Sequence, residues 1–306
     1  MSKTAFIFPG QGSQFVGMGK DLYERYDLAR KYYEQANEIL GFDVKTISFE
    51  GPEEELKQTR TTQPAIFVHS VIVYELLKAK GFKPDFVAGH SLGEYAALVA
   101  TGVLSFADAL EIVKLRGAEM QKAGENNPGT MAAIVGLTSE QVVEVCAKAS
   151  AAGIVQAANF NSPVQTVISG SVAGVQEAMK VAKETGAKIV KELPVSGAFH
   201  SPLMGSAVEP LKAKLNSKKM HDADITVIPN VTAQPNRSGS EMKELLICQV
   251  TAPVKWAQTV DLMLNEGVTR FVEVGPGKVL QGLVKSISKE ALLCGVGTPD
   301  EIENFA

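Results

Sequence analysis

This sequence of 306 residues contains little of what defines several other classes of protein. Only three cysteines are present, at widely separated positions (Cys146, Cys248 and Cys294), which argues against a disulfide framework or a zinc cluster and is typical of a reducing cytoplasm. No apolar run is long enough to span a membrane, and the first residues lack the pattern of a signal peptide. The net charge of -4 offers no general attraction for nucleic acid. We therefore expect a cytoplasmic protein that has neither a membrane nor a nucleic acid as a partner.

What is present is typical of a globular α/β protein. Hydrophobic residues make up 45% of the chain and charged residues 21%, and the length suffices for one large domain or for a domain that carries an insert. Strands are predicted at 4–8, 84–88, 225–232 and 269–277, and helices at 64–80, 105–123, 240–250, 256–267 and 278–288. This alternation predicts an α/β-hydrolase-like domain with a mainly parallel sheet and helices on both faces.

A different rhythm begins near Pro128. The pattern there predicts the order β-α-β-β-α-β, with strands at 130–137, 153–160, 164–170 and 187–195 and helices at 138–151 and 172–186. That order is typical of a ferredoxin-like fold. We therefore predict a small ferredoxin-like subdomain at 127–197, inserted into a large catalytic domain made of 1–126 and 198–306.

The run GHSLG at 89–93 has the form G-x-S-x-G. It follows a predicted strand and precedes a helix-forming run, which is the layout of a nucleophile elbow. The glycines tolerate a strained backbone, and the free N–H groups of a helix N-terminus favour developing negative charge. Ser91 is therefore a candidate nucleophile, and the alternative is an ordinary turn between a strand and a helix.

A serine nucleophile needs a base, and the sequence has four histidines. His69 lies in an apolar helical run, which is typical of a core histidine. His90 is adjacent to the serine on a tight turn, where neighbouring side chains diverge, and His221 lies in a charged stretch typical of the surface. His200 remains, in a predicted loop, and we predict it as the base. The alternative is a surface-loop histidine.

The groups that would support this pair are less clear. Asp108 is the only aspartate between the two residues, and it is a weak candidate for a third member. A backbone carbonyl or an amide side chain is the other way to orient the imidazole. The loop 8–14 follows the first strand, and it suggests that Gln11 or a nearby N–H, together with the N–H of Leu92, forms an oxyanion hole.

Arg116 falls on the apolar stripe of the predicted helix 105–123. A buried guanidinium needs an anionic partner or several acceptors, and its planar fork suits a carboxylate held by two hydrogen bonds. The functional interpretation is a substrate carboxylate. Helical spacing alone supports a structural ion pair with Glu94 or Glu119 equally well.

Six motifs in this order resemble the malonyl-CoA:acyl carrier protein transacylase family of bacterial type II fatty acid synthesis: FPGQGSQ (8–14), GHSLGEYAAL (89–98), RGAEM (116–120), GAFHSPLM (197–204), QVTAPVKW (249–256) and EVGPGKVL (273–280). The resemblance covers nearly the whole chain. Several of the motifs are shared with acyltransferase domains of polyketide synthases.

The resemblance implies roles for individual residues. Ser91 would carry the malonyl ester, and His200 would act as general base and then as general acid. Gln11 and the N–H of Leu92 would form the oxyanion hole. The main-chain carbonyl of Gln249 would help to orient the imidazole.

The resemblance also implies how the substrate is recognised. Arg116 would hold the malonyl carboxylate, and Asn159 and Asn161 would line the cleft beneath the small subdomain. Phe199 would reject an α-methyl group sterically, because family members that use methylmalonyl carry a smaller residue there.

The implied activity is ping-pong transfer of malonyl from malonyl-CoA, a coenzyme A thioester, to the phosphopantetheine thiol of acyl carrier protein. No cofactor and no metal are expected, and we expect a monomer. The carrier of this family is acidic, so docking calls for a basic patch, or these lysines form an ordinary solvated face: Lys180, Lys183, Lys188, Lys191, Lys212, Lys214, Lys218 and Lys219.

The alternatives are a standalone acyltransferase of a polyketide pathway, a serine thioesterase or esterase, and a non-catalytic protein that binds acyl carrier protein. The first differs in its preferred carrier, the second in hydrolysing the acyl group. Failure of Ser91 to become acylated would indicate the third.

Overall fold

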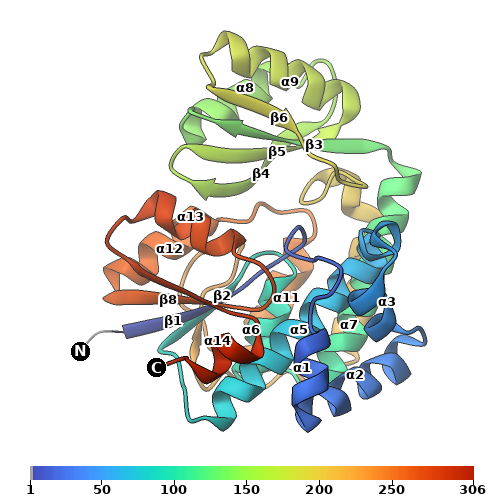
Figure 1. Cartoon of the computed structure of the whole chain (residues 1–306). Helices are drawn as coiled ribbons and strands as arrows, with labels where there is room; N and C mark the ends of the chain where they lie inside the picture. The colour runs from blue at the N-terminus through green and yellow to red at the C-terminus, as the bar shows by residue number, and fades with distance from the viewer. Residues whose placement is uncertain (1–2) are drawn as a thin grey trace.

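The structure is a computed structural model that describes residues 3–306; residues 1 and 2, which belong to the predicted large domain, lie outside the described part. A five-stranded sheet with all neighbours parallel forms the centre of the larger region, in the order β7-β2-β1-β8-β9. Its strands are β1 (Lys3–Phe8), β2 (Phe86–Gly89), β7 (Thr226–Val227), β8 (Val268–Val274) and β9 (Leu292–Val296). Figure 1 shows this sheet in the lower part of the molecule.

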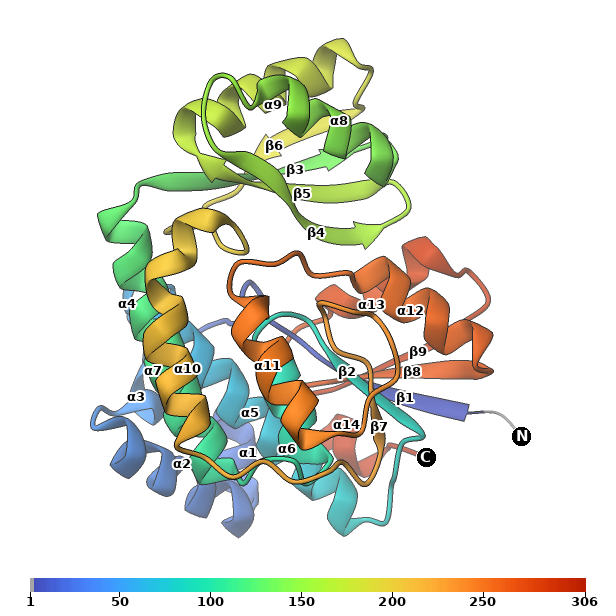
Figure 2. The same ribbon diagram turned by 180° about the vertical axis from the view of Figure 1, so that it is seen from behind.

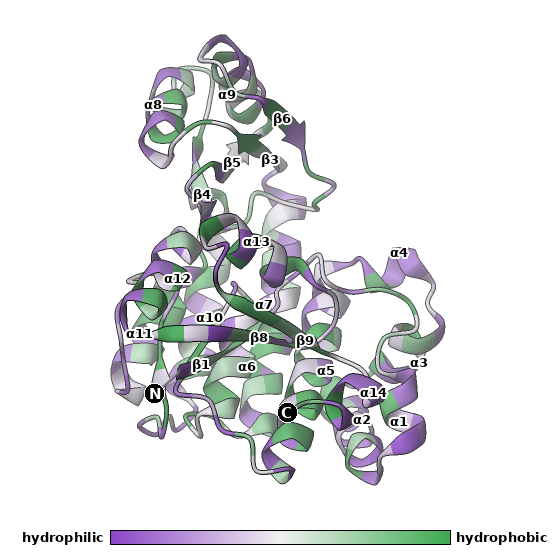
Figure 3. Ribbon diagram, turned by 60° about the vertical axis from the view of Figure 1, so that its left-hand side comes forward, coloured by the Kyte–Doolittle hydropathy of each residue, from purple (hydrophilic) through white to green (hydrophobic). Residues whose placement is uncertain are grey.

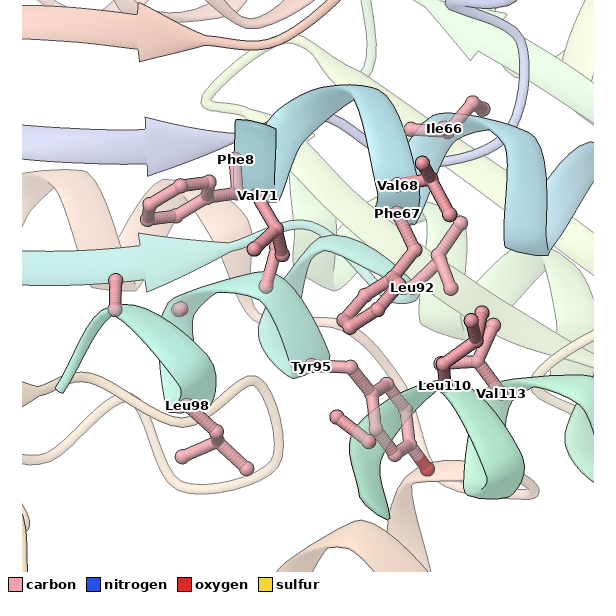
Figure 4. Close-up of a cluster of buried hydrophobic side chains, with 14 of the residues drawn as sticks. Phe8, Ile66, Phe67, Val68, Val71, Leu92, Tyr95, Leu98, Leu110 and Val113 are labelled. Carbon is pink, nitrogen blue, oxygen red and sulfur yellow. The ribbon is translucent and has the colours of Figure 1, made fainter. Parts of the chain in front are cut away.

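Helices cover both faces of this sheet, and this explains why β1 is a continuous apolar run. Phe6 and Phe8 point to one face, where they join the core formed with α5 (Thr59–Ala79), α6 (Gly93–Ala100) and α7 (Phe106–Asn126). Ala5 and Ile7 point to the other face, against α12 (Trp256–Asn265) and α13 (Val279–Ile287). Figure 4 shows the first of these cores: Phe8 lies beside Val71 of α5, and side chains of α6 and α7 complete the cluster.

The remaining helices surround this core. They are α1 (Lys20–Arg25), α2 (Asp27–Leu40), α3 (Val44–Glu50), α4 (Glu53–Leu56), the 3₁₀ helix η1 (Pro202–Ala207), α10 (Val208–Asn216), α11 (Gly239–Gln249) and α14 (Pro299–Glu303). Figure 2 shows α10 and α11 in front of the sheet in that view, with α7 beside α10. Figure 3 shows a hydrophobic ribbon along β9 and hydrophilic segments on outer helices such as α1 and α4, the expected pattern for surface helices.

A second sheet is antiparallel, in the order β4-β5-β3-β6, and lies in the upper part of Figure 1. Its elements are β3 (Gly129–Val135), α8 (Ser139–Ala149), β4 (Val155–Ser162), β5 (Gln165–Ser171), α9 (Val172–Glu184) and β6 (Ile189–Glu192). The predicted order β-α-β-β-α-β is therefore confirmed, and both helices share one core with the sheet. The boundaries at 127 and 197 stay a prediction.

Several elements differ from the prediction. The segment 20–56 forms α1 to α4, for which no helix was predicted, and β9 and α14 follow the predicted closing helix. The predicted strand 225–232 shrinks to β7, because Pro229 has no N–H for a sheet and the chain turns at Ala233, whose φ is 52°. The predicted strand 269–277 ends at Val274, because Gly275 adopts a φ of 141°.

The two sheets meet at the carboxyl ends of β1 and β2. Strand β4 lies along the segment around Val254: Phe160 N–H donates to the Val254 carbonyl at 2.9 Å, and Val254 N–H donates to the Ala158 carbonyl at 2.8 Å. The loops that follow β1 and β2 therefore lie between the parallel sheet and β4. Ligands of open parallel sheets bind at such an edge.

Candidate active site

Ser91 lies on a sharp turn between β2 and α6. Its φ is 52°, in the left-handed region that costs energy for any residue except glycine. The two glycines of the motif are required by space, because a Cβ on Gly89 would overlap the main chain of Gly93, and a Cβ on Gly93 would overlap the carbonyl of Phe8. The turn therefore has the strained geometry of a nucleophile elbow.

His200 contacts this serine directly. Its Nε2 lies 2.8 Å from Ser91 Oγ, and its Nδ1 lies 2.8 Å from the main-chain carbonyl of Gln249. A carbonyl only accepts, so Nδ1 carries the proton and Nε2 is free to accept from the serine hydroxyl. Burial, helped by the positive charge of Arg116, lowers the pKa of His200 to about 3, so the imidazole is neutral at physiological pH.

The other histidines lie as the elimination predicted. His69 is buried in α5, and burial lowers its pKa to about 4. His90 points away from the serine, with its Nε2 2.9 Å from Asn161 Oδ1, and His221 is exposed. Asp108, the weak candidate for a third member, is excluded from that role, because its carboxylate accepts from the Ser105 hydroxyl at 2.8 Å and pairs with Lys218 at 2.7 Å.

Arg116 lies beside Ser91 Oγ and is 1% exposed. It donates to Gln63 Oε1 at 2.7 Å, to Gln249 Oε1 at 2.9 Å and to Ser91 Oγ at 3.1 Å. All three acceptors are neutral, and among the described residues no ion pair joins Arg116 to Glu94 or Glu119, the partners of the structural alternative. A buried guanidinium that lacks a contacting carboxylate can hold an anionic ligand next to the serine.

The side chain of Gln249 connects the members of this site. Its Nε2 donates to Glu94 Oε2 at 2.8 Å and to the Ser91 carbonyl at 3.0 Å, while its Oε1 accepts from Arg116. Glu94 is fully buried, and burial raises its pKa to about 7. A buried acid and a buried cation therefore share one amide.

Sequence reasoning missed two residues of the site. Asn230 Oδ1 accepts from the N–H of Ser91 at 2.7 Å, and its Nδ2 donates to the carbonyl of Gly89 at 2.6 Å, so it fixes the turn. Gln63 holds Arg116. A polar side chain within a predicted strand, 225–232, was an available signal for Asn230, whereas Gln63 lies just before the predicted helix 64–80 and carried none.

Two N–H groups lie free for an oxyanion. Within the described chain, the main-chain N–H groups of Leu92 and Gln11 donate no hydrogen bond, and both residues line the same cavity as Ser91. The side chain of Gln11 approaches Thr59 Oγ1 at 3.5 Å. Donors that are not already engaged are what a developing negative charge requires.

The cavity lies between the two sheets. It is lined by Gln11, Gln63, His90, Ser91, Leu92, Arg116, Met120, Met131, Asn159, Leu193, Val195, Phe199 and His200. Asn161 does not line it and instead contacts His90. The loop 275–277, which follows β8, packs against Pro9 and Ser13 and does not line the cavity.

The lysines considered for carrier docking divide into two groups. The first group, Lys180 to Lys191, lies on the small sheet region, and the second, Lys212 to Lys219, follows His200. In the second group, Lys214 and Lys218 pair with Glu111 of α7, at 2.5 and 2.8 Å, so part of its charge is neutralised. On the small sheet region, Lys183, Lys188 and Lys191 are exposed. The first group is therefore the more accessible basic surface.

Comparisons with known proteins agree along the whole chain. The family model described as the acyl transferase domain matches residues 5–300. A malonyl CoA-acyl carrier protein transacylase of Bacillus subtilis is 47% identical over 304 residues, covering 99% of this chain and 96% of that protein, and one of Haemophilus influenzae is 44% identical, covering 94% and 93%.

Solved structures give the same picture. An acyl carrier protein S-malonyltransferase from Vibrio cholerae has a TM-score of 0.96 and 40% identity, covering 100% of both chains. A malonyl-transacylase solved in complex with its type II polyketide synthase acyl-carrier protein has a TM-score of 0.95 and 37% identity, covering 99% of this chain and 98% of that one. Among residues 3–306, no helix is long and apolar enough to cross a membrane, and no cluster of three or more metal-ligating side chains is present.

Proposed function

This chain belongs to the acyl transferase family, and from that premise we propose that it transfers the malonyl group from malonyl-CoA to the phosphopantetheine thiol of acyl carrier protein in fatty acid biosynthesis. It is an acyltransferase, and the relatives that it matches over nearly their full length are named malonyl CoA-acyl carrier protein transacylase. The observation that carries the choice of acyl group is the contact of Arg116 with Ser91 Oγ at 3.1 Å, because it places a guanidinium beside the reacting oxygen.

In the first half-reaction, Ser91 Oγ attacks the thioester carbonyl while its proton passes to Nε2 of His200. The N–H groups of Leu92 and Gln11 donate hydrogen bonds to the oxyanion of the tetrahedral intermediate. The intermediate collapses, the C–S bond breaks, and the proton on His200 goes to the coenzyme A thiolate. The product is a malonyl ester of Ser91.

In the second half-reaction, the carrier thiol gives its proton to His200 and attacks the ester. The C–O bond breaks, and the proton returns to Ser91 Oγ. His200 is 3% exposed and the Gln249 carbonyl takes its other nitrogen, so the base has little contact with water. This burial supports transfer over hydrolysis, because the ester must survive the exchange of coenzyme A for the carrier.

The pocket supports selection of malonyl over acetyl and methylmalonyl. A malonyl carboxylate gives Arg116 an anionic partner, whereas acetyl leaves the guanidinium with neutral acceptors alone. Phe199 lies in the cavity wall and is 7% exposed, so it takes the space that an α-methyl group requires. Asn159, on β4, also lines the cavity, and we propose that it contacts the acyl chain or thioester.

His200 accepts and returns every proton that moves in this scheme, so we propose that the reaction needs no cofactor. We also propose that the reaction runs in the cytoplasm, and the three cysteines, which are free, support a reducing compartment.

The test is intact-protein mass after mixing with malonyl-CoA or with acetyl-CoA, for wild type, Ser91→Ala and Arg116→Ala. We expect a malonyl adduct on wild type, none on Ser91→Ala, and a preference for acetyl in Arg116→Ala. Steady release of coenzyme A without an adduct would indicate a hydrolase instead. If wild type shows no adduct and also releases no coenzyme A, the proposed roles of the site residues are contradicted.

A further inference from the structure

Glu94 is a buried acid directly behind the nucleophile. It belongs to the first turn of α6 and is 1% exposed. Its Oε2 accepts from Gln249 Nε2 at 2.8 Å and from the main-chain N–H of Asn230 at 3.2 Å. The proposed reaction uses neither its proton nor its charge.

One amide group separates Glu94 from Arg116. Gln249 donates to Glu94 through Nε2 and accepts from Arg116 through Oε1, at 2.9 Å. Among the described residues the acid and the guanidinium form no direct ion pair, yet their charges interact across a site from which water is largely excluded. Where it is ionised, Glu94 is therefore an anion already present in the Arg116 network, which consists of Arg116, Gln63, Gln249 and Glu94.

A malonyl carboxylate on Arg116 would be a second anion in the same network. Like charges at short range in a buried site repel. Each anion therefore reduces the net stabilisation that the other receives from the shared guanidinium. We propose that Glu94 determines acyl specificity by weakening the hold of Arg116 on the malonyl carboxylate, so that the malonyl group stays transferable to the second thiol. The inference rests on the proposed function, since it requires Arg116 to hold that carboxylate.

The groups around Glu94 keep a constant charge near neutral pH. Arg116 on α7 stays protonated, and burial raises the pKa of Tyr95 on α6 to about 12. Burial lowers the pKa of His200 to about 3, and it lowers the pKa of His90 too. Burial places the pKa of Glu94 itself at about 7.

The experiment measures the exchange equilibrium between acyl-CoA with free enzyme and acyl-enzyme with coenzyme A. Intact-protein mass gives the acylated fraction in fixed mixtures of acyl-CoA and coenzyme A, with malonyl and with acetyl separately. Glu94→Gln keeps an acceptor oxygen and removes the charge. We call the malonyl equilibrium constant divided by the acetyl equilibrium constant the malonyl-to-acetyl ratio. We expect this ratio to be roughly tenfold higher in Glu94→Gln than in wild type, because a charge interaction worth one pKa unit changes an equilibrium constant tenfold.

Glu273→Gln is the matched control. Glu273 is another buried acid, but its carboxylate accepts from the N–H groups of Leu280 and Gln281 at the start of α13, outside the Arg116 network. Its malonyl-to-acetyl ratio should equal that of wild type. An equal rise in both variants would overturn the inference.

A second measurement requires no variant. Lowering the pH from about 8 to about 6 neutralises Glu94 in wild type, so the malonyl-to-acetyl ratio should rise, and ionisation of the coenzyme A thiol cancels from that ratio. A ratio that is unchanged by pH and by Glu94→Gln, on an enzyme that does form the malonyl ester, overturns this inference alone. Absence of any malonyl ester on wild type overturns the proposed function and this inference with it.

Discussion

The side-chain amide of Gln156 donates a hydrogen bond to the main-chain carbonyl of His200 at 2.8 Å and a second one to the carbonyl of Thr251 at 3.1 Å. Gln156 belongs to β4 of the antiparallel sheet, whereas His200 has returned to the larger region with a φ of 57°. A left-handed backbone at a non-glycine residue must be held by its surroundings. The small sheet therefore holds the proposed base in position as well as forming a wall of the cavity.

Replacing Gln156 should slow acylation without unfolding the protein. In Gln156→Ala, the carbonyls of His200 and Thr251 lose their donor, and the imidazole loses its alignment with Ser91. We expect acylation by malonyl-CoA to slow about tenfold and the free energy of unfolding to fall by about 1–2 kcal/mol. Rapid-quench mass spectrometry and urea denaturation give the two values.

The control for that prediction is Gln141→Ala. Gln141 completes the capping box at the start of α8, so its loss should lower stability and leave acylation unchanged. Equal slowing in both variants would mean that loosening the small sheet, rather than losing the contact with His200, limits the rate.

Asn230 should be required for the shape of the serine turn. In Asn230→Ala, the N–H of Ser91 and the carbonyl of Gly89 both lose their partner in a buried site. We expect a loss of about 2–4 kcal/mol in unfolding free energy and a lower acylation rate. Asn230→Asp keeps the acceptor for Ser91, so it should retain more activity than Asn230→Ala; the reverse order would contradict the assigned contacts.

The pH dependence of acylation should show no loss that belongs to His200 between pH 8 and pH 5, because burial lowers the pKa of this residue to about 3. A decline in the acylation rate with a midpoint near 6.5 would show that the imidazole is not protected in this way. Ser91→Ala gives the background for the measurement.

The same shift makes stability depend on pH. Between about 6.5 and 3 the unfolded chain binds a proton at this histidine and the folded chain does not, so its contribution to stability falls as the pH drops, by up to about 1.4 kcal/mol per pH unit. Glu94, with its raised pKa, acts in the opposite direction over part of this range. The difference in unfolding free energy between wild type and His200→Asn, measured across pH, isolates the histidine.

Phe199 should limit the size of the acyl group. Phe199→Ser opens the wall of the cavity, so methylmalonyl-CoA should acylate Ser91 more readily, by about 1–3 kcal/mol in selectivity, equivalent to about 10–200-fold. Competition between malonyl-CoA and methylmalonyl-CoA, followed by mass, measures the ratio. Phe160→Ser, on β4 of the small sheet and outside the lining of this cavity, should leave the ratio unchanged.

The elements that local pattern predicts well are the apolar runs. The strand that becomes β1, the strand and helix around Ser91, and the order of the small sheet follow from periodicity and glycine spacing, which act over a few residues. The short helices between 20 and 56 were missed because their apolar faces are short and broken. The predicted strand 225–232 was too long because its end depends on Pro229 and on packing against β2.

The sequence by itself determined what is local or exclusive: a serine on a sharp turn between a strand and a helix, a candidate base reached by elimination among four histidines, and the family. Only the tertiary structure decided what Arg116 contacts, since helical spacing left a carboxylate ligand and an ion pair equally open. It also decided that Gln63, Asn230, Gln249 and Glu94 meet around one serine. Hydrogen bonds form within about 3 Å, and residues separated by as many as 158 positions reach that distance only when α5, α6, α7 and α11 pack together.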